Sequence, residues 1–178
     1  ILSHHNLRFG GDWKQNFKEL FDTPQLPGDP SYYICKPTET DPDLSPPGTD
    51  NLFVLVPIPP GLNLSEADMT GYRQKILDLM KTDLNLPDIE EYIKFEKSYW
   101  SDDFRRDYNA YKGTALGLAH TLKQTLKRPL NYSKKVKNLY YVGAGTSPGI
   151  GMPICLISAE LVYKRIQKIK TSKPLESL

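Results

Sequence analysis

The sequence predicts a mixed α+β or α/β fold, and three observations lead to this prediction. Short apolar segments rich in β-branched and aromatic residues lie between turn-forming residues, which is typical of strands. Longer segments carry apolar residues at helical spacing. In residues 138–166 an apolar run, a glycine-rich turn and a helical pattern follow one another. No internal repeats are visible, so we expect one continuous α and β segment.

The first part of the chain predicts one helix and two strands. Trp13, Phe17, Leu20 and Phe21 recur at helical spacing, and Pro24 ends that segment. SYYICKP (31–37) reads as a short strand, and TETDPDLSPPGTDN (38–51) as a loop with several turns. LFVLVPIPPG (52–61) predicts a second strand that ends at its prolines or lies at a sheet edge, because proline cannot donate to the ladder.

The middle of the chain predicts two helices with a strand between them. Ser65 can cap the first helix, whose apolar stripe comprises Met69, Tyr72, Ile76, Leu79 and Met80. After Pro87, the even spacing of Ile89, Ile93 and Phe95 predicts a half-buried strand. SDDFRRDYNAYKGT (101–114) predicts a capped turn that leads into a helix, and Pro129 ends this helix. Its inward-facing residues are expected to be Leu118, Ala119, Leu122 and Leu126.

The last part of the chain predicts a strand, a turn and a helix. NLYYVG (138–143) reads as the strand. The apolar stripe of the final helix comprises Ile154, Ile157, Leu161, Val162, Ile166 and Ile169. Gly143, Gly145, Gly149 and Gly151 form the turn between them, and Pro153 suits the first turn of the helix.

Composition limits the classes of partner. With 23 basic and 21 acidic residues among 178, nothing indicates a nucleic-acid partner. A basic cluster at the C-terminus is either the solvated end of a helix or a contact with an anionic membrane surface; it comprises Lys164, Arg165, Lys168, Lys170 and Lys173. The apolar runs 52–58 and 154–162 are too short to span a bilayer. Since the chain starts at Ile1, we expect residues upstream of it, and no targeting signal is visible.

Cysteines and histidines do not predict a metal site. Cys35 and Cys155 lie far apart in sequence, without metal-ligand spacing, which is typical of free thiols in a reducing compartment. His4 and His5 are adjacent, so we expect their side chains to point in different directions, and His120 is distant. We therefore expect no metal.

The glycine turn has the chemistry of a nucleotide-binding segment. Glycine lets backbone amides approach a ligand closely, and a helix N-terminus attracts anions. The alternative is a tight strand-to-helix connection that binds nothing. The dinucleotide fingerprint G-x-G-x-x-G fails here, because Pro148 stands at the third glycine position and no later strand carries the ribose-binding acid. The turn can contact a dinucleotide, but it cannot be the primary phosphate-binding motif.

Several stretches resemble one family in order and spacing. NLYYVGAGTSPGIGMP (138–153) is similar to the C-terminal flavin-contacting motif of the phytoene desaturase family, a branch of the amine-oxidase-like flavoproteins. Upstream, residues 1–22 resemble its His-His segment, residues 30–60 its paired strands, and residues 102–146 its run into the flavin motif. The resemblance covers nearly the whole chain, and these stretches look most like those of the fungal members of the family.

The resemblance implies a C-terminal portion of an FAD-dependent enzyme. Residues 1–130 would belong to a mixed-sheet substrate-binding domain, and residues 131–178 would return into the FAD-binding domain as its last strand and helix. The primary phosphate-binding unit would lie in an N-terminal portion outside this chain. The cofactor-binding residues implied are Gly143, Ala144, Gly145 and Thr146, the first three against the ribityl-pyrophosphate, and Gly151, Met152 and Pro153 beside the flavin ring.

The implied reaction is dehydrogenation of phytoene to more conjugated, lycopene-type carotenoids, with FAD as hydride acceptor. The resemblance also implies an intracellular enzyme at a membrane surface, since its polyene substrate is a hydrocarbon. Tyr32, Phe53, Val54 and Phe95 would suit a hydrocarbon tunnel or equally an ordinary core. No catalytic base is assigned, because Glu96 and Asp103 equally suit a solvated role. Alternatives are a related polyene isomerase or retinoid saturase, or a non-catalytic lipid-binding module.

Overall fold

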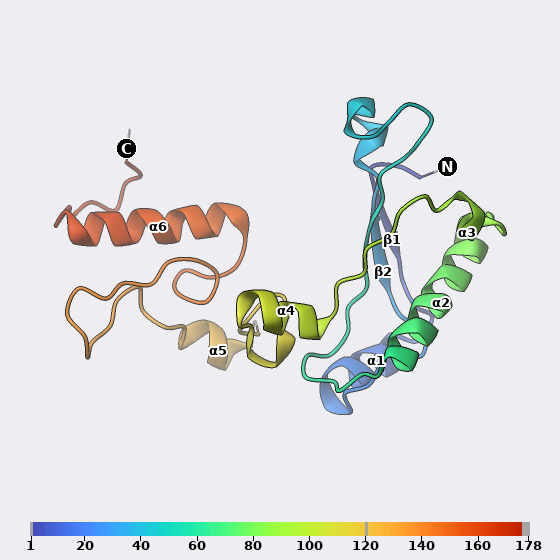
Figure 1. Ribbon diagram of the computed structural model, residues 1–178. Helices are drawn as coiled ribbons and strands as arrows, with labels where there is room; N and C mark the ends of the chain where they lie inside the picture. The colour runs from blue at the N-terminus through green and yellow to red at the C-terminus, as the bar shows by residue number, and fades with distance from the viewer. Residues whose placement is uncertain (1, 120, 176–178) are drawn as a thin grey trace. The chain divides into compact units, whose positions relative to one another are not determined.

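The chain contains the predicted mixture of helices and strands. The computed structural model describes residues 2–119 and 121–175 and divides the chain into two compact units, Ile1–Gly113 and Thr114–Leu178 (Figure 1). We call them the N-terminal and C-terminal units. His120 lies outside the described residues, and so does the side chain of Leu126. The assignment of 1–130 to substrate and 131–178 to FAD stays a prediction.

The N-terminal unit contains a three-stranded antiparallel sheet of order β1-β2-β3. Its strands are β1 (His5–Arg8), β2 (Tyr32–Cys35) and β3 (Phe53–Leu55). The two predicted strands are confirmed as β2 and β3, and β3 is an edge strand that ends before Pro57, as the prolines require. In the register His5 faces Cys35 and Arg8 faces Tyr32. The described strands pair only antiparallel, so a mixed sheet stays a prediction.

Helix α2 (Glu66–Asp83) confirms the predicted cap. The Asp68 amide donates to Ser65 Oγ at 3.2 Å, and the Ser65 amide donates to Asp68 Oδ2 at 2.9 Å, which is a capping box. Of the predicted stripe, Tyr72, Ile76 and Met80 are buried, while Met69 and Leu79 are half-buried. The helix forms because one apolar face covers the sheet.

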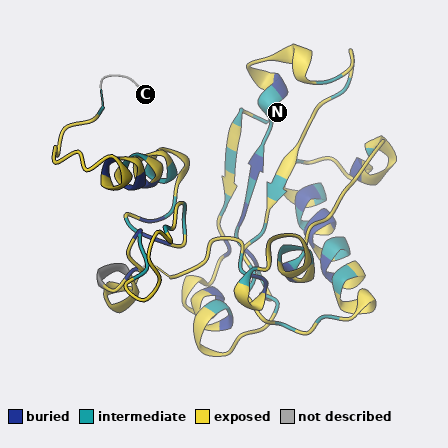
Figure 2. Cartoon of the chain, turned by 60° about the vertical axis from the view of Figure 1, so that its left-hand side comes forward, coloured by how far each residue is buried: buried dark blue, intermediate teal, exposed yellow. Residues whose placement is uncertain are grey.

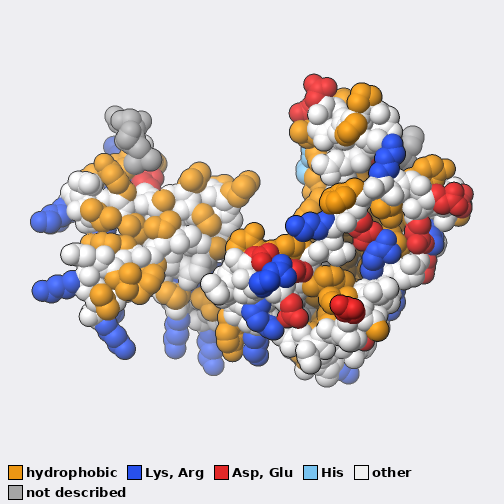
Figure 3. Space-filling view, viewed as in Figure 1, with side chains coloured by type: hydrophobic (Ala, Val, Ile, Leu, Met, Phe, Trp, Pro, Cys, Tyr) orange, Lys and Arg blue, Asp and Glu red, His pale blue; other side chains and the backbone are white. Residues whose placement is uncertain are grey.

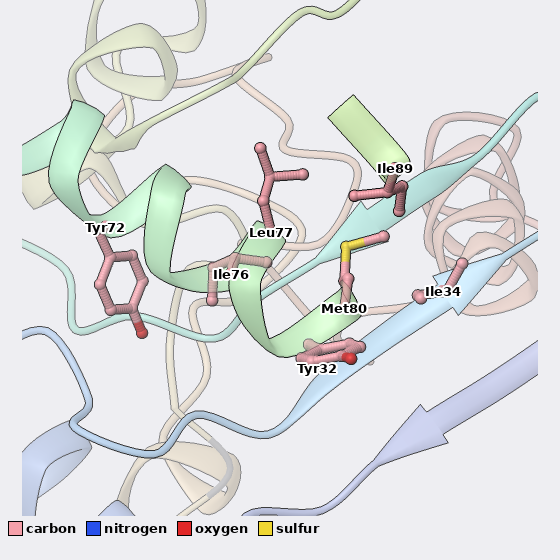
Figure 4. Close-up of a cluster of buried hydrophobic side chains, with 7 residues drawn as sticks. All are labelled: Tyr32, Ile34, Tyr72, Ile76, Leu77, Met80 and Ile89. Carbon is pink, nitrogen blue, oxygen red and sulfur yellow. The ribbon is translucent and has the colours of Figure 1, made fainter. Parts of the chain in front are cut away.

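The core of the N-terminal unit lies between β2, α2 and α3 (Figure 4). Its buried side chains are Tyr32, Ile34, Tyr72, Ile76, Leu77, Met80 and Ile89. Ile34 is 1% exposed, so its burial stabilises the unit by about 2 kcal/mol. Of the possible tunnel residues, Tyr32 belongs to this core, whereas Phe53 and Phe95 are 56% and 84% exposed.

The predicted strand through Ile89, Ile93 and Phe95 is wrong. Ile89 instead opens a short helix, α3 (Ile89–Tyr92), and packs into the core. Glu90 and Glu91 lie in the first turn of this helix, where negative charge is favourable. No strand follows among the described residues, because nothing pairs with the backbone of 93–95. Even spacing of three apolar residues was too weak a signal over so short a segment.

The predicted capped turn at 101–114, leading into a helix that ends at Pro129, is also wrong in part. The first segment contains a helix, α4 (Ser101–Tyr108), and the helix predicted after it is only the short α5 (Leu122–Leu126). The backbone leaves the helical region at Asn109 and Gly113, with φ of 51° and 68°. Gly113 cannot be replaced there, since a Cβ would lie 2.1 Å from the Ser101 carbonyl oxygen. Leu118, Ala119 and Leu122 are exposed rather than inward, Leu122 by 83%.

The first helix confirms the predicted position but turns its aromatic side chains outward. It comprises α1 (Trp13–Phe17) followed by the π-helix η1 (Lys18–Asp22). Its buried side chains are polar: Asn16 and Glu19. Four aromatic rings stack along the outside, with neighbouring centroids 5.2–6.3 Å apart and exposures of 52–69%. We call these residues, Phe9, Trp13, Phe17 and Phe21, the aromatic row.

Short 3-10 turns complete the N-terminal unit, and one long helix dominates the C-terminal unit. The turns are η2 (Pro37–Glu39), η3 (Pro42–Leu44) and η4 (Tyr111–Gly113). The long helix is α6 (Met152–Ile166). In Figure 2 exposed residues alternate with buried and half-buried ones along much of the chain, α6 included. Within residues 2–119 and 121–175, no helix combines the length and the apolar character that crossing a membrane requires.

Candidate cofactor-binding site

The glycine turn precedes α6 and depends on glycine for its path. Gly143, Gly149 and Gly151 have φ of 109°, 142° and 118°, a region that other residues rarely adopt. Gly145 has an ordinary φ, and a Cβ placed on it or on Gly143 would meet no atom within 4 Å. Space beside these two glycines is therefore open to a ligand.

Buried polar side chains hold the turn from beneath. Ser158, in α6, is 0% exposed, and its Oγ accepts from the Gly143 amide at 3.1 Å and from Asn131 Nδ2 at 3.0 Å. Asn131 Nδ2 also donates to the Ser147 carbonyl at 2.6 Å. Thr146 is 3% exposed and donates its hydroxyl to the Pro129 carbonyl at 2.8 Å. These contacts tie the turn to α6 and to residues 129–131.

Arg128 places a buried positive charge beneath the turn. It is 8% exposed, and its Nη1 donates to the Ala144 carbonyl at 3.2 Å. A Cβ on Gly149 would lie 3.1 Å from the guanidinium carbon, so glycine is needed for this packing. Nη2 is buried without a hydrogen-bond partner, and no carboxylate pairs with Arg128 among the described residues. A buried cation without a partner is costly, so this position suits an anion.

The N-terminus of α6 adds to the same electrostatic character. Gly151 is its N-cap and supplies no side-chain cap. The amides of Met152 and Ile154 have no carbonyl partner inside the helix, and Pro153 has no N–H to satisfy. The positive end of a 15-residue helix therefore lies at the turn. An open hollow of ≈ 370 Å³ also borders the turn, lined by Pro129, Tyr141, Val142, Gly145 and Thr146.

Five of the seven predicted site residues lie on this turn and the other two, Met152 and Pro153, open α6, which follows from their closeness in sequence. Gly145, Gly151, Met152 and Pro153 are exposed, and Met152 is 86% exposed. Gly143 and Ala144 are half-buried. Thr146 differs, because its hydroxyl is used inside the protein and positions the turn. A flavin contact by any of the seven stays a prediction.

Sequence reasoning missed Arg128, Asn131 and Ser158. Arg128 and Asn131 precede the turn in a segment with no motif, and Ser158 lies on the helix after it. A buried Arg in an otherwise polar, lysine-rich segment gives no local signal, since charged residues in such segments are mostly solvated. Ser158 carried the one weak hint, because it is the single hydroxyl among the apolar residues 152–159.

The predicted strand before the turn is reduced to one bridge, so that prediction is wrong for the described residues. Tyr132 pairs with Tyr140, flanked by hydrogen bonds from Ser133 to Leu139 and from Tyr141 to Asn131, both 2.9 Å. The pairing cannot extend because Pro129 lacks a donor before Asn131 and Gly143 turns away after Tyr141. Residues 139–141 therefore pair only with the three residues 131–133, which is too short a pairing to count as a strand.

Helix α6 forms as predicted, but its apolar stripe is mostly exposed. Only Val162 of the six predicted residues is buried, and Ile169 lies beyond the helix end. Ile157, Leu161 and Ile166 are 41–51% exposed, and hydrophobic side chains are visible on the surface of this unit in Figure 3. The helix buries Ser158 and Val162 instead because that face meets the segment around Asn131.

Two residues of the basic cluster at the C-terminus make contacts within the protein, and the other three are exposed. Lys164 is buried and binds the Glu160 carboxylate at 2.5 Å, and its ammonium lowers the pKa of that carboxyl. The Arg165 guanidinium lies over the Tyr132 ring, 3.9 Å from its centroid. Lys168, Lys170 and Lys173 are exposed. Three of the five cations, rather than all of them, remain for an anionic surface.

The two acids considered for catalysis have structural roles. Both Glu96 oxygens accept from Arg73, at 2.6 and 2.5 Å, and this contact lowers the pKa of Glu96. Asp103 accepts from the Trp100 amide at 2.8 Å as part of the cap of α4. Neither carboxylate is poised as a general base.

The expectation that the adjacent histidines diverge is wrong. The rings of His4 and His5 have centroids 4.3 Å apart, because His4 lies in a bend before β1 rather than in the strand. Cys35, opposite His5 in the sheet, joins them. One ligand atom from each of the three residues lies within 4.8 Å of the others.

The fold and the turn define a segment that can clamp an anionic cofactor, and comparison with known proteins identifies its family. The sequence profile described as "Flavin containing amine oxidoreductase" matches residues 6–166. The chain belongs to this flavin-containing amine oxidoreductase family, in the branch of the carotenoid and phytoene desaturases. The cofactor that membership implies is FAD, and the cationic, glycine-lined turn fits it.

Three relatives are similar over most of the chain. A carotenoid 3,4-desaturase of Haloarcula japonica is 48% identical over 89% of the chain and 32% of its own length. A zeta-carotene-forming phytoene desaturase of Myxococcus xanthus is 41% identical over 93% and 32%. A 4,4'-diapophytoene desaturase of a Methylomonas species is 35% identical over 94% and 33%. The chain thus spans about a third of the length of the curated relatives it matches. The resemblance to fungal members of the family stays a prediction.

Proposed function

We propose that this chain is the C-terminal portion of an FAD-dependent phytoene desaturase of carotenoid biosynthesis. The observation that carries the proposal is the glycine turn, where a helix N-terminus and a buried cation lie beside open space, and the cation has no carboxylate partner among the described residues. The substrate class rests on relatives whose names describe carotenoid or phytoene desaturases. The product is a more conjugated, lycopene-type carotenoid.

The residues of the turn position and charge the site. Gly143 and Gly145 would let the backbone approach the ribityl-pyrophosphate, and Arg128 would meet its negative charge. Gly151, Met152 and Pro153 would lie beside the flavin ring, where the N-terminus of α6 would favour negative charge on the ring. Bound FAD supplies the hydride acceptor for dehydrogenation. The catalytic acid and base are not assigned to this chain.

The remaining two thirds of the protein complete the cofactor domain. Residues 131–178 return into it as its last segment and helix, and residues 1–130 form part of the polyene-binding domain. The exposed apolar face of α6 supports this arrangement, since Leu156 is 73% exposed and large apolar surfaces are rarely left to water. Pairing with strands from the upstream portion would also extend residues 138–143.

The reaction is tested by expressing the full reading frame in a phytoene-accumulating host and extracting the pigments. Coloured carotenoid is expected, because each dehydrogenation lengthens the conjugated system. A second host that accumulates an already conjugated carotenoid tests the 3,4-desaturase type of substrate. Folded, flavin-loaded protein that changes neither substrate overturns the desaturase and leaves the polyene isomerase or retinoid saturase. Protein that folds without any flavin leaves the lipid-binding module.

The cofactor contact is tested with Gly145→Leu in the full-length protein. This position has ordinary backbone angles and open space, so the added side chain removes ligand space without a clash inside the turn. We expect loss of bound FAD with an unchanged fold by circular dichroism. Gly71→Leu is the matched control, because Gly71 is exposed on α2 and also has no atom within 4 Å. Equal FAD content in the two variants removes the turn from the cofactor site.

Arg128→Met tests the charge beneath the turn. A charge-assisted hydrogen bond contributes about 1.5–3 kcal/mol, which corresponds to roughly a 10- to 150-fold rise in the Kd for FAD. Arg105→Met is the control, since Arg105 is exposed and pairs with Asp102 at the surface. An Arg128→Met protein that binds FAD as tightly as its parent contradicts this role.

We also propose that the enzyme contacts a membrane surface through the aromatic row. Exposed aromatic rings next to lysines are typical of helices that lie in the lipid interface, and Lys14 and Lys18 lie along the same segment. Flotation with liposomes of graded anionic content measures the contact. Replacing Trp13 and Phe17 by Ser should weaken it, whereas Phe95→Ser, an equally drastic change at an exposed ring, should not. Flotation that is indifferent to lipid in the parent protein overturns this proposal.

A further inference from the structure

His4, His5 and Cys35 converge at the end of the β1–β2 pair. His5 and Cys35 are direct partners in the antiparallel register, so their side chains share one face of the sheet. His4 precedes the strand in a bend, which brings its ring to within 4.3 Å of the His5 ring, centroid to centroid. One ligand atom from each of the three lies within 4.8 Å of the others. Sequence spacing alone could not place these groups together.

Both imidazole rings are oriented by hydroxyl groups. His4 Nδ1 lies 2.7 Å from Thr40 Oγ1, and His5 Nδ1 lies 2.7 Å from the Tyr33 hydroxyl. The second nitrogen of each ring is thereby left for another partner. Histidine ligands of metal ions are held in the same way, by a hydrogen bond on the nitrogen that does not bind the metal. Tyr33 and Cys35 are two residues apart on β2, so their side chains lie on the same face of the sheet.

The charges around the cluster do not oppose a cation. Lys36 follows Cys35 directly, but its ammonium binds Glu39 at 3.2 Å and Asp50 at 3.3 Å. These two carboxylates neutralise it. His4 and Cys35 are half-buried and His5 is exposed, so an ion from solvent can reach the three groups.

We propose that His4, His5 and Cys35 bind a zinc ion, with a fourth position open to water or another ligand. Two imidazoles and a thiolate are a ligand set that zinc prefers. Tetrahedral zinc with these ligands requires ligand atoms roughly 3.3–3.6 Å apart. In the structure the three ligand atoms are at most 4.8 Å apart, so side-chain movements of roughly 1 Å bring them to the separation that zinc requires. The ion cross-links the bend before β1 to the end of β2.

Cobalt(II), a spectroscopic probe for zinc sites, tests the proposal in the full-length, flavin-loaded protein. After metal removal, Co²⁺ titration is expected to produce visible bands of tetrahedral geometry and a thiolate charge-transfer band, both displaced by one equivalent of Zn²⁺. Difference spectra against the same protein without Co²⁺ remove the flavin absorption. A parent protein that yields neither band overturns the site.

Variants assign the bands to the three residues. Cys35→Ser should abolish the charge-transfer band, and His4→Gln, in the bend outside the strand, should weaken Co²⁺ binding at least tenfold while β1 stays intact. Thr40→Val, which removes only the orienting hydroxyl, should weaken binding by about tenfold. Cys155→Ser, the matched change at the other cysteine, should leave both bands unchanged. A charge-transfer band that persists in Cys35→Ser and disappears in Cys155→Ser refutes the assignment.

Discussion

Ser158→Ala should loosen the glycine turn and weaken the binding of FAD in the full-length protein. The Ser158 hydroxyl is fully buried and accepts hydrogen bonds from the Gly143 amide and from Asn131 Nδ2. Alanine removes this acceptor and adds nothing in its place. Two donors then lose a partner: the half-buried Gly143 amide on the turn and the buried Asn131 Nδ2 beneath it.

The size of the effect follows from those two donors. Leaving a buried donor unsatisfied costs about 1–3 kcal/mol, so two such donors would cost roughly 2–6 kcal/mol. We expect the lower part of this range, about 2–4 kcal/mol, because the Gly143 amide is only half-buried and Asn131 Nδ2 keeps the Ser147 carbonyl as an acceptor. Because the cost falls on the conformation of the turn that binds the cofactor, the Kd for FAD rises, by roughly 30-fold at the lower end of this range. For the flavin-loaded protein, whose turn is held in this conformation, the same cost lowers the free energy of unfolding by at least about 2 kcal/mol.

Two measurements on the full-length protein check this prediction. FAD added to apoprotein gives the Kd from the quenching of flavin fluorescence, and urea unfolding gives the loss of stability. Ser172→Ala is the control, because Ser172 is an exposed serine in the same unit. If Ser158→Ala matches Ser172→Ala in both the Kd and the urea midpoint, the buried hydroxyl does not hold the turn and the reasoning is refuted.

Three further predictions concern the stability of the N-terminal unit and the behaviour of the isolated chain. Ile34→Ala should lower the free energy of unfolding by about 2–5 kcal/mol, whereas Phe95→Ala, at an 84% exposed ring, should change it little; equal urea midpoints contradict the assigned core. Hydrogen bonds from Gln15 and from the Gly28 amide lower the pKa of Glu19, so its contribution is present above the unfolded-state pKa of about 4.3 and is lost as pH falls through the lower folded value. Glu19→Gln should therefore flatten the loss of stability below about pH 4.3, and an unchanged pH profile speaks against this contribution. The 178 residues expressed alone should not retain FAD, since they supply only the second clamp; stoichiometric flavin absorbance in the purified chain contradicts this.

The sequence alone was sufficient for features that are set by neighbouring residues. Ser65 and Asp68 form their predicted capping box because both partners lie within one turn. The prolines after Leu55 end β3 by removing backbone donors, whatever else surrounds the strand. The glycine turn, the start of α6 near Pro153 and the resemblance to a desaturase motif were likewise readable from one short stretch.

Only the tertiary structure decided which faces are buried and which distant groups meet. Arg128 and Ser158 are 30 positions apart in the sequence, yet both contact the glycine turn, and His5 meets Cys35 through strand pairing. The aromatic row is exposed although its spacing fits a buried helix face, because Asn16 and Glu19 find hydrogen-bond partners on the inner side. Local sequence sets backbone preference, but burial and pairing depend on partners far along the chain, and a single sequence does not name those partners.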